Sequence, residues 1–308
     1  MYYFPSVTGD NTSEAAHRSG YVAIIGRPNV GKSTLLNAIL ERKIAAVTPK
    51  PQTTRTRILG IKTLPNAQIL FIDTPGVHEA RGLLNERMVA VAKHALAEAD
   101  VILWLVDAAA GVQAADRHVH KLAVASGKPI CVATTKIDSV RKDALLPLLD
   151  ELSRLCPDRA VVPVSAVSGD NVDRLLAVIA DALPAGPAFY PAEDITDQSE
   201  RAIVAEIIRE KVILETRDEV PYAVAVHVDE FTEKPEQSLV VIKATIHVAR
   251  ESQKPIVIGQ RGARIKAIGQ AARREIEVLL ERRVFLELFV RVQTDWTTQP
   301  ARLKDFGL

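Results

Sequence analysis

Short apolar runs alternate with amphipathic segments from the N-terminal region of the chain up to Leu183. Continuous apolar runs, typical of buried strands, lie at Tyr21–Ile25, Ile69–Ile72, Val101–Val106, Ile130–Ala133 and Val161–Val164. Between them, apolar residues recur at helical spacing in Leu83–Ala97, Ala114–Ser126, Lys142–Leu155 and Val172–Leu183. Apolar strands that alternate with helices predict an α/β domain with a mostly parallel sheet covered on both faces.

The pattern changes after Leu183. The next residues are rich in proline and glycine and predict a linker over 184–199. Beyond it, the sequence predicts a helix, two strands, a glycine-containing loop, a helix and a last strand, at Glu200–Glu215, Ala223–Phe231, Leu239–Ala249, Ala263–Leu280 and Val284–Val292. This order favours a smaller α+β domain. We therefore expect a disordered N-terminal extension over 1–19, one domain over 20–183 and a second over 200–308.

Composition adds few constraints. Hydrophobic residues make up 47% and charged residues 25% of the 308 positions, which is typical of a globular protein. The formal net charge of +1 indicates no partner, so any basic patch must be local. No apolar run approaches the roughly 20 residues that span a bilayer, and the polar N-terminus does not resemble a signal peptide. Cys131 lies in an apolar run and is expected to be a reduced core thiol, and a total of only two cysteines favours a cytoplasmic protein.

The first motif follows the first predicted strand and opens a helix. It matches the phosphate-binding pattern G-x-x-x-x-G-K-[ST]. Its glycines let backbone N–H groups face phosphates, and the helix N-terminus favours anions. Lys32 is placed to reach the β- and γ-phosphates, and the Ser33 hydroxyl to bind Mg²⁺. The predicted nucleotide-binding residues here are Gly26, Arg27, Pro28, Asn29, Val30, Gly31, Lys32 and Ser33.

A second motif ends the strand at Ile69–Ile72. Asp73 at this strand end can hold Mg²⁺, through water, beside the phosphate-binding loop. The Gly76 N–H can contact the γ-phosphate. We include in the predicted site the whole segment and the residue after it: Asp73, Thr74, Pro75, Gly76 and Val77.

Two further strand ends are predicted to bind the base. The Asp138 carboxylate can accept hydrogen bonds from N1–H and the 2-amino group of guanine, a pair that adenine lacks. An unpaired buried carboxylate rejects the wrong base strongly. The Lys136 stem can lie against the base, and the backbone near Ser165 can face the guanine O6. The predicted base site comprises Thr135, Lys136, Ile137, Asp138, Ser165 and Ala166.

The four motifs GRPNVGKS, DTPG, TKID and SA together resemble those of the translation-factor-class GTPases. The resemblance implies GTP and GDP as ligands, Mg²⁺ as cofactor and hydrolysis of GTP. That family usually has Asn where this chain has Thr135, although Rho-type GTPases also have Thr there. The sequence Gln52–Arg55 is similar to the family's switch I motif, in which one threonine binds Mg²⁺ when GTP is bound. We favour Thr54 over Thr53.

Val77 stands where Ras-like GTPases have the glutamine that orients the attacking water. The chain thus resembles GTPases with a hydrophobic replacement of this glutamine. In potassium-dependent members, an Asn at the position of Asn29 helps to bind K⁺ in place of an arginine finger. We expect slow, K⁺-stimulated hydrolysis, with Lys32, Thr54, Asp73, Gly76 and Asn29 as the catalytic set. Arg27 and Arg55 are the alternatives within the chain to K⁺.

The second domain carries a G-x-x-G sequence before a helix. It matches the loop with which KH domains clamp an RNA backbone. The chain has no Asp or Glu between Ser252 and Arg274, and its basic side chains there form a local positive patch. Trp296 has two interpretations, stacking on a base and packing at the end of the domain. The predicted RNA-binding residues are Lys254, Gly259, Gln260, Arg261, Gly262, Arg264 and Lys266.

A GTPase domain joined through a proline-rich linker to a type II KH domain resembles the bacterial ribosome-assembly GTPases. The resemblance includes the stretches Ile195–Gln198 and Glu206–Lys211. It implies binding to 16S rRNA near its 3′ end, action on the small (30S) ribosomal subunit and rRNA processing. It also implies a loose association with the inner membrane face and a mostly monomeric state. The alternatives are a C-terminal domain that binds protein or membrane, and a nucleotide-binding scaffold with little turnover.

Overall fold

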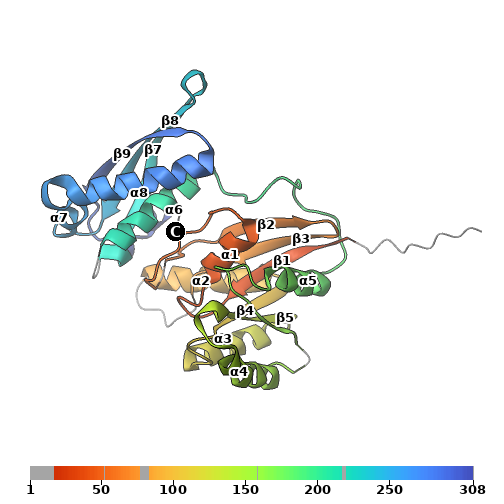
Figure 1. The fold of residues 1–308 in the computed structure, drawn as a ribbon. Helices are drawn as coiled ribbons and strands as arrows, with labels where there is room; N and C mark the ends of the chain where they lie inside the picture. Colours follow the sequence, from red (N-terminus) through yellow and green to blue (C-terminus); the bar gives the residue numbers. More distant parts are fainter. Residues whose placement is uncertain (1–16, 52, 77–82, 158, 217–219, 308) are drawn as a thin grey trace, which may run out of the picture.

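The computed structural model describes residues 17–51, 53–76, 83–157, 159–216 and 220–307. They form two units that meet at a junction, and the chain ends near this junction (Figure 1). Within the described residues, no helix combines the length and the apolar character needed to cross a membrane.

The N-terminal unit is built on a six-stranded sheet with the order β2-β3-β1-β4-β5-β6. Only β2 runs antiparallel to its neighbour β3. The strands β1 and β4 are sequence-distant neighbours, so the strand order reverses beside β1, and such switch points place ligands at the carboxyl ends of strands. The bounds are β1 Arg18–Ile25, β2 Ile58–Leu64, β3 Ala67–Asp73, β4 Val101–Asp107, β5 Ile130–Thr135 and β6 Val161–Pro163.

Helices cover both faces of this sheet. Alternate residues of β1 point to opposite faces, so Val22 and Ile24 pack with α1 (Lys32–Leu40) and α5 (Val172–Ala182). Ala23 and Ile25 pack with the helices of the other face. These are α2 (Leu83–Glu98), α3 (Ala114–Ala125) and α4 (Lys142–Leu155). The predicted α/β architecture with a mostly parallel sheet is confirmed.

The C-terminal unit has a three-stranded sheet with the order β7-β8-β9. β7 and β8 are antiparallel, whereas β8 and β9 are parallel. Two long helices, α6 and α8, pack side by side against this sheet (Figure 1). The predicted α+β arrangement is confirmed. The bounds are α6 Glu200–Glu215, β7 Val224–Lys234, β8 Leu239–Val248, α7 Gln253–Ile258, α8 Ala263–Leu280, β9 Arg283–Val292 and α9 Pro300–Asp305.

Three elements were not predicted. β2 contains Gly60 and Lys62, which interrupt its apolar run, and it forms because β3 offers an edge for pairing. The helices α7 and α9 have six residues each, too few for a helical period to show. The predicted C-terminal boundary of the N-terminal extension, residue 19, is wrong, because Arg18 and Ser19 already belong to β1. Residues 1–16 lie outside the described residues.

Both cysteines are free and buried, and the prediction of a core thiol at Cys131 is confirmed. Burial raises the pKa of the Cys131 thiol to about 11. A thiol of this kind stays protonated and unreactive near neutral pH, so Cys131 is a core residue.

The predicted linker lies along the edge of the first sheet. The Gln68 side chain accepts from the backbone N–H of Tyr190 at 2.9 Å and donates to its carbonyl at 2.8 Å. The Ile195 carbonyl accepts from a backbone N–H of β2 at 2.8 Å. The Thr196 hydroxyl donates to a carbonyl of the same strand at 2.6 Å. Most of the linker is thus anchored to the N-terminal unit.

Candidate functional site

The phosphate-binding loop curls around the amine of Lys32. Gly26 allows this close turn, because a Cβ there would lie 2.7 Å from the Val30 side chain. The Lys32 Nζ donates to the carbonyls of Gly26 at 3.3 Å and Arg27 at 3.2 Å. Burial lowers the pKa of Lys32 to about 8, against the opposing effect of Asp73. The loop opens on a cavity of about 500 Å³.

Three oxygens from three segments meet beside this cavity. The Ser33 hydroxyl donates to Asp73 Oδ2 at 2.6 Å, and the Thr54 hydroxyl lies 2.9 Å from Ser33 Oγ and 3.3 Å from Asp73 Oδ2. Asp73 is fully buried, and burial raises the pKa of its carboxyl group. Its Oδ1 has no hydrogen-bond partner in the described part of the chain. Clustered oxygens with an unsatisfied carboxylate fit Mg²⁺.

The two switch I threonines point to different places. The Thr53 hydroxyl lies 2.6 Å from the Thr48 hydroxyl and donates to the Lys50 carbonyl at 2.9 Å, within its own loop. The hydroxyl of Thr54 is therefore the one that joins the oxygen cluster. Gln52 lies outside the described residues.

The segment after β3 packs closely on the phosphate-binding loop. Thr74 is buried and donates to the Ile24 carbonyl at 2.9 Å, so its hydroxyl secures the strand end. Pro75 is also buried. A Cβ at Gly76 would lie 3.1 Å from backbone atoms of Pro28, which brings the Gly76 backbone to the rim of the phosphate cavity. The predicted residue Val77 lies outside the described residues.

The end of β5 is tied to the phosphate-binding loop. The Thr135 hydroxyl donates to the Val30 carbonyl at 2.7 Å, which gives a physical reason for a hydroxyl at this position. The Lys136 Nζ donates to the Asn29 carbonyl at 2.7 Å and to Asp107 Oδ2 at 2.8 Å. Two segments predicted from separate motifs are thereby joined.

The Asp138 carboxylate, which is predicted to read the base, is held from one side. The Ser165 hydroxyl donates to Asp138 Oδ1 at 2.6 Å, which leaves the carboxylate oriented beside the loop of Ser165 and Ala166. The Ser165 oxygen also accepts from the N–H groups of Val167 and Ser168 at 3.2 and 3.1 Å. Ile137 lies in the short turn between Lys136 and Asp138 and is partly buried.

Both arginines considered as alternatives to K⁺ contact other groups. Arg27 forms ion pairs with Asp107 at 3.5 Å and Asp116 at 3.3 Å. Arg55 is 5% exposed and faces the C-terminal unit. Asn29 lies beside the loop that leads into the switch I motif, because its amide donates to the Pro49 carbonyl at 2.8 Å.

Sequence reasoning missed Asp107 and Asp116. Asp107 ends β4 and orients both Lys136 and Arg27. Asp116 is fully buried and pairs with Arg27. Asp107 follows an apolar strand, as Asp73 does, and this shared position was the available signal.

The G-x-x-G loop joins α7 to α8 and requires glycine for two different reasons. At Gly259 (φ 75°, ψ 172°) a Cβ would lie 2.6 Å from the Arg264 Cβ and 2.9 Å from its nitrogen. At Gly262 the φ of 78° favours glycine, but a Cβ would meet no atom of the described residues within 4 Å apart from its own chain neighbours. Gln260 and Arg261 between them are exposed.

The predicted RNA-binding side chains divide into two groups. Arg261 and Lys266 are exposed and Lys254 is half-buried beside a groove of about 540 Å³ between α7 and β9. Arg264 instead donates to the Ile256 carbonyl and braces α7 against α8. Trp296 is fully buried and donates to a backbone carbonyl at 3.1 Å, so the packing interpretation is confirmed.

Known families match both units. The family described as 50S ribosome-binding GTPase matches residues 21–136, and the family described as KH domain matches residues 219–297. The chain is 52% identical to GTPase Era of Geotalea uraniireducens, over 96% of this chain and 99% of that relative. It is 51% identical to GTPase Era of Geobacter metallireducens over the same shares. The chain belongs to the Era family of GTPases.

Solved Era structures agree with this assignment. Two of them superpose with a TM-score of 0.90 at 44% identity, over 94% of this chain and 99% of each structure. One is an Era variant from Aquifex aeolicus bound to GDP and aluminium fluoride. The other is Era in complex with MgGDPNP and nucleotides 1506–1542 of 16S ribosomal RNA. As a member of this family, the chain is an enzyme that binds and hydrolyses GTP.

Proposed function

We propose that the chain is a GTP-dependent switch that binds 16S rRNA near its 3′ end and acts in the assembly of the small ribosomal subunit and in rRNA processing. The observation that carries this proposal is the G-x-x-G loop, whose exposed Gln260 and Arg261 lie between two helices in a family with a 16S rRNA complex. The phosphates of RNA are expected to lie against this loop, with Lys254 and Lys266 near them.

For the nucleotide, we propose the following roles. Lys32 binds the β- and γ-phosphates, because its amine lies within the loop that cradles them. Ser33, Thr54 and Asp73 hold Mg²⁺, supported by their shared oxygen cluster. Asp138 selects guanine. These roles follow from the position of each side chain at the rim of the phosphate cavity or at the end of a neighbouring strand.

We propose that K⁺ stimulates hydrolysis beside Asn29. Supporting this, Asn29 contacts switch I, whereas Arg27 and Arg55 are engaged by other partners. A monovalent cation there would supply positive charge to the transition state, as an arginine finger does.

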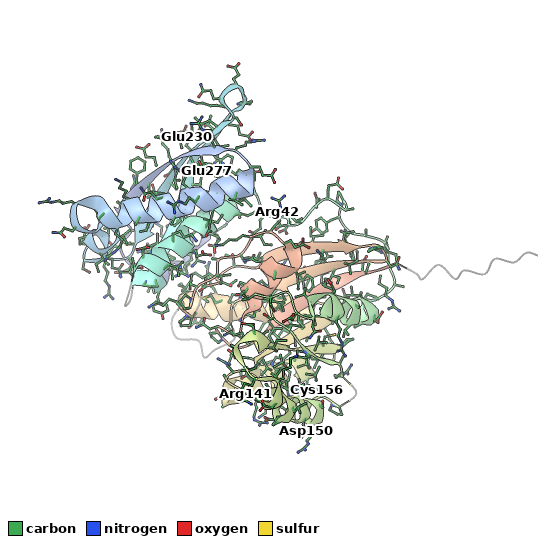
Figure 2. The ribbon with its side chains drawn as sticks, in the orientation of Figure 1. Arg42, Arg141, Asp150, Cys156, Glu230 and Glu277 are labelled. Carbon is green, nitrogen blue, oxygen red and sulfur yellow. The ribbon has the colours of Figure 1, made fainter. Side chains whose placement is uncertain are left out.

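The RNA proposal is tested with a charge-reversed loop. The double variant Gln260→Asp/Arg261→Asp lowers the charge by three, one from the first substitution and two from the second. The control Arg141→Asp/Lys142→Gln makes the same change at the far end of the GTPase domain (Figure 2). We expect the loop variant to lose 16S 3′-end RNA binding and to flatten its salt dependence, whereas the control binds like the wild type.

The result also decides between this function and its alternatives. RNA binding by the loop variant equal to that of the control would contradict the KH assignment of the loop and favour a C-terminal domain that binds protein or membrane. GTP affinity, measured in parallel, should be the same in the loop variant and the wild type because the loop lies away from the phosphate cavity.

We further propose a cytoplasmic location, where the small ribosomal subunit is assembled. The peripheral association with the inner membrane face and the monomeric state both stay predictions of the sequence.

A further inference from the structure

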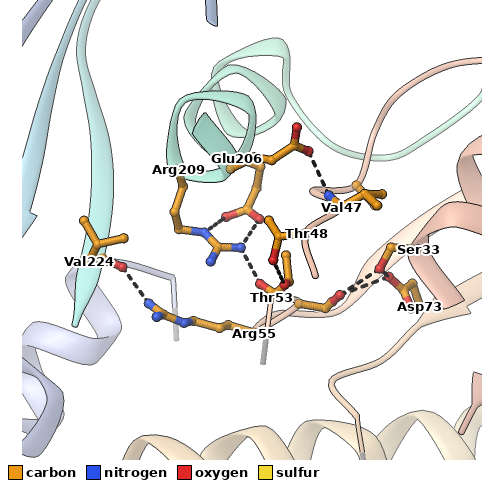
Figure 3. Close-up of polar contacts among 12 residues, drawn as sticks. Ser33, Val47, Thr48, Thr53, Arg55, Asp73, Glu206, Arg209 and Val224 are labelled. Atoms are coloured by element: carbon orange, nitrogen blue, oxygen red, sulfur yellow. Dashed lines mark hydrogen bonds and ion pairs between the residues drawn. The ribbon is translucent and has the colours of Figure 1, made fainter. Parts of the chain in front are cut away.

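The Mg²⁺-binding threonine lies between two residues that are held by the other domain. Thr54 contributes its hydroxyl to the oxygen cluster of the GTPase domain. Its neighbours Thr53 and Arg55 contact the KH domain: Thr53 contacts α6, and Arg55 contacts the start of β7 and the segment before it. Figure 3 shows Arg209 beside Thr53, and Arg55 extending away from Ser33 and Asp73 toward Val224. The two domains thus meet on either side of Thr54.

The Arg55 guanidinium donates hydrogen bonds to backbone carbonyl groups of the KH domain. Its guanidinium donates to the carbonyls of Val224 at 2.7 Å and of Pro221 and Tyr222 at 3.0 Å each. It also lies over the ring of Trp296, 5.8 Å from the centroid. A buried guanidinium depends on such acceptors, because an unpaired buried charge is strongly unfavourable. Arg55 therefore stays in this position only while the KH domain is docked.

Arg209 fixes the other side. It is 3% exposed and donates to the Thr53 carbonyl. Glu206, one turn earlier on α6, accepts from Arg209 at 2.8 and 2.5 Å and so fixes the direction of the guanidinium. Glu210, which follows Arg209 on α6, accepts from the Val47 N–H at 2.7 Å. Val47 lies in the loop between α1 and β2, which also contains Thr53 and which we call the switch I loop. One face of α6 thus contacts the switch I loop at two separated points.

We propose that Arg209 and Arg55 are positioning residues for GTP hydrolysis, through which the docked KH domain holds Thr54 in the geometry that binds Mg²⁺. The inference rests on the proposed role of Thr54. When the Thr53 carbonyl and the Arg55 side chain are both fixed, the Thr54 hydroxyl between them can take few positions. A group that is already ordered before the reaction lowers the entropic part of the reaction barrier. By linkage, a docked KH domain that strengthens the binding of Mg²⁺ and GTP by some factor is itself favoured by bound Mg²⁺ and GTP by the same factor.

The test compares full-length variants in single-turnover hydrolysis at several Mg²⁺ concentrations. We expect Arg209→Ala to lower kcat by about tenfold and to raise the Mg²⁺ concentration for half-maximal rate, because a charged hydrogen bond to switch I is lost. GDP affinity should be unchanged, since the base and diphosphate sites are intact. The control Arg42→Ala (Figure 2) removes an exposed interdomain ion pair with Glu281 (3.2 Å) but none of the hydrogen bonds of Thr53 and Arg55, and it should behave like the wild type.

A double-mutant cycle separates positioning from general domain packing. If Arg209 acts through Thr54, Thr54→Ala/Arg209→Ala should hydrolyse GTP no more slowly than Thr54→Ala alone. Independent, multiplicative losses would overturn the inference, as would equal behaviour of Arg209→Ala and Arg42→Ala. A Thr54→Ala variant with an unchanged Mg²⁺ dependence would instead refute the role proposed for Thr54 itself.

A second variant keeps the test decisive if Arg209→Ala does not fold. Arg55→Lys retains the buried charge, but one ammonium cannot reach the three carbonyls that the guanidinium spans. We expect the same fall in kcat and the same shift in Mg²⁺ dependence. Normal hydrolysis by Arg55→Lys would count against the inference.

Discussion

Replacing Gly259 or Gly262 with alanine adds one methyl group at either end of the G-x-x-G loop, with different expected costs. Gly259 has backbone angles that only glycine adopts easily. Holding another residue in this conformation costs about 2 kcal/mol of backbone strain. Its new Cβ would also lie 2.6 Å from the Arg264 Cβ, and relieving such crowding costs about 2 kcal/mol more. We therefore expect Gly259→Ala to lower the free energy of unfolding of the KH domain by about 4 kcal/mol.

The cost at Gly262 should be much smaller. Its φ of 78° is left-handed, which costs an alanine about 1–2 kcal/mol. Apart from its chain neighbours, no atom of the described residues lies within 4 Å of the added methyl, and the stiffer unfolded chain offsets part of the strain. We expect a net loss of about 1 kcal/mol. That methyl would nevertheless project from the loop surface where RNA is proposed to lie, so RNA affinity should fall about tenfold despite near-normal stability.

The assay is urea unfolding of the full chain in excess GDP, which stabilises the GTPase domain and separates the two transitions. Titration with 16S 3′-end RNA completes the comparison. Equal losses of stability for the two variants would refute the crowding argument at Gly259. Normal RNA binding by Gly262→Ala would refute the placement of RNA against the loop.

Three further predictions concern the nucleotide site. Asp138→Asn should shift preference from GTP toward xanthosine triphosphate, because an amide can donate to the 2-oxo group of xanthine; competition binding checks this, and unchanged GTP preference would contradict it. Hydrolysis should be faster in K⁺ than in Na⁺, and Asn29→Ala should abolish the difference, which phosphate-release assays in the two salts would show; equal rates for the wild type would count against the K⁺ site. The lowered pKa of Lys32, about 8, means that its amine loses its proton as pH rises through 8. GTP phosphates need the charged form, so affinity should fall above pH 8 and binding there should take up a proton, as calorimetry in buffers of different ionisation enthalpy would reveal; constant affinity from pH 7 to 9 would contradict this.

The candidate nucleotide site could be predicted because its residues follow buried strands. Asp73 and Asp138 come after apolar runs, and the ends of neighbouring parallel strands meet at one edge of a sheet. The choice of Thr54 over Thr53 came from the resemblance, and the structure adds its geometric basis. The spacing of apolar residues and the short motifs were sufficient to predict this site, because both can be read from neighbouring positions in the sequence.

Contacts between the domains could not be predicted in this way. The stretch that contains Glu206 and Arg209 supported the resemblance, but nothing in its pattern indicated that Arg209 reaches the Thr53 carbonyl. Such a contact depends on how two separately folded units dock. The direction of Arg264 was likewise hidden, because a basic residue in a basic run looks solvent-facing until α7 is known to pack beside it.

The anchored linker limits how far the KH domain can travel. Because Thr196 is still hydrogen-bonded to β2 and α6 is capped at Ser199, only a short tether, about 10 Å when extended, separates the two units. A unit on so short a tether remains at a very high effective concentration relative to its docking site. Separately expressed domains mixed in solution would therefore associate far more weakly than the same surfaces do within one chain.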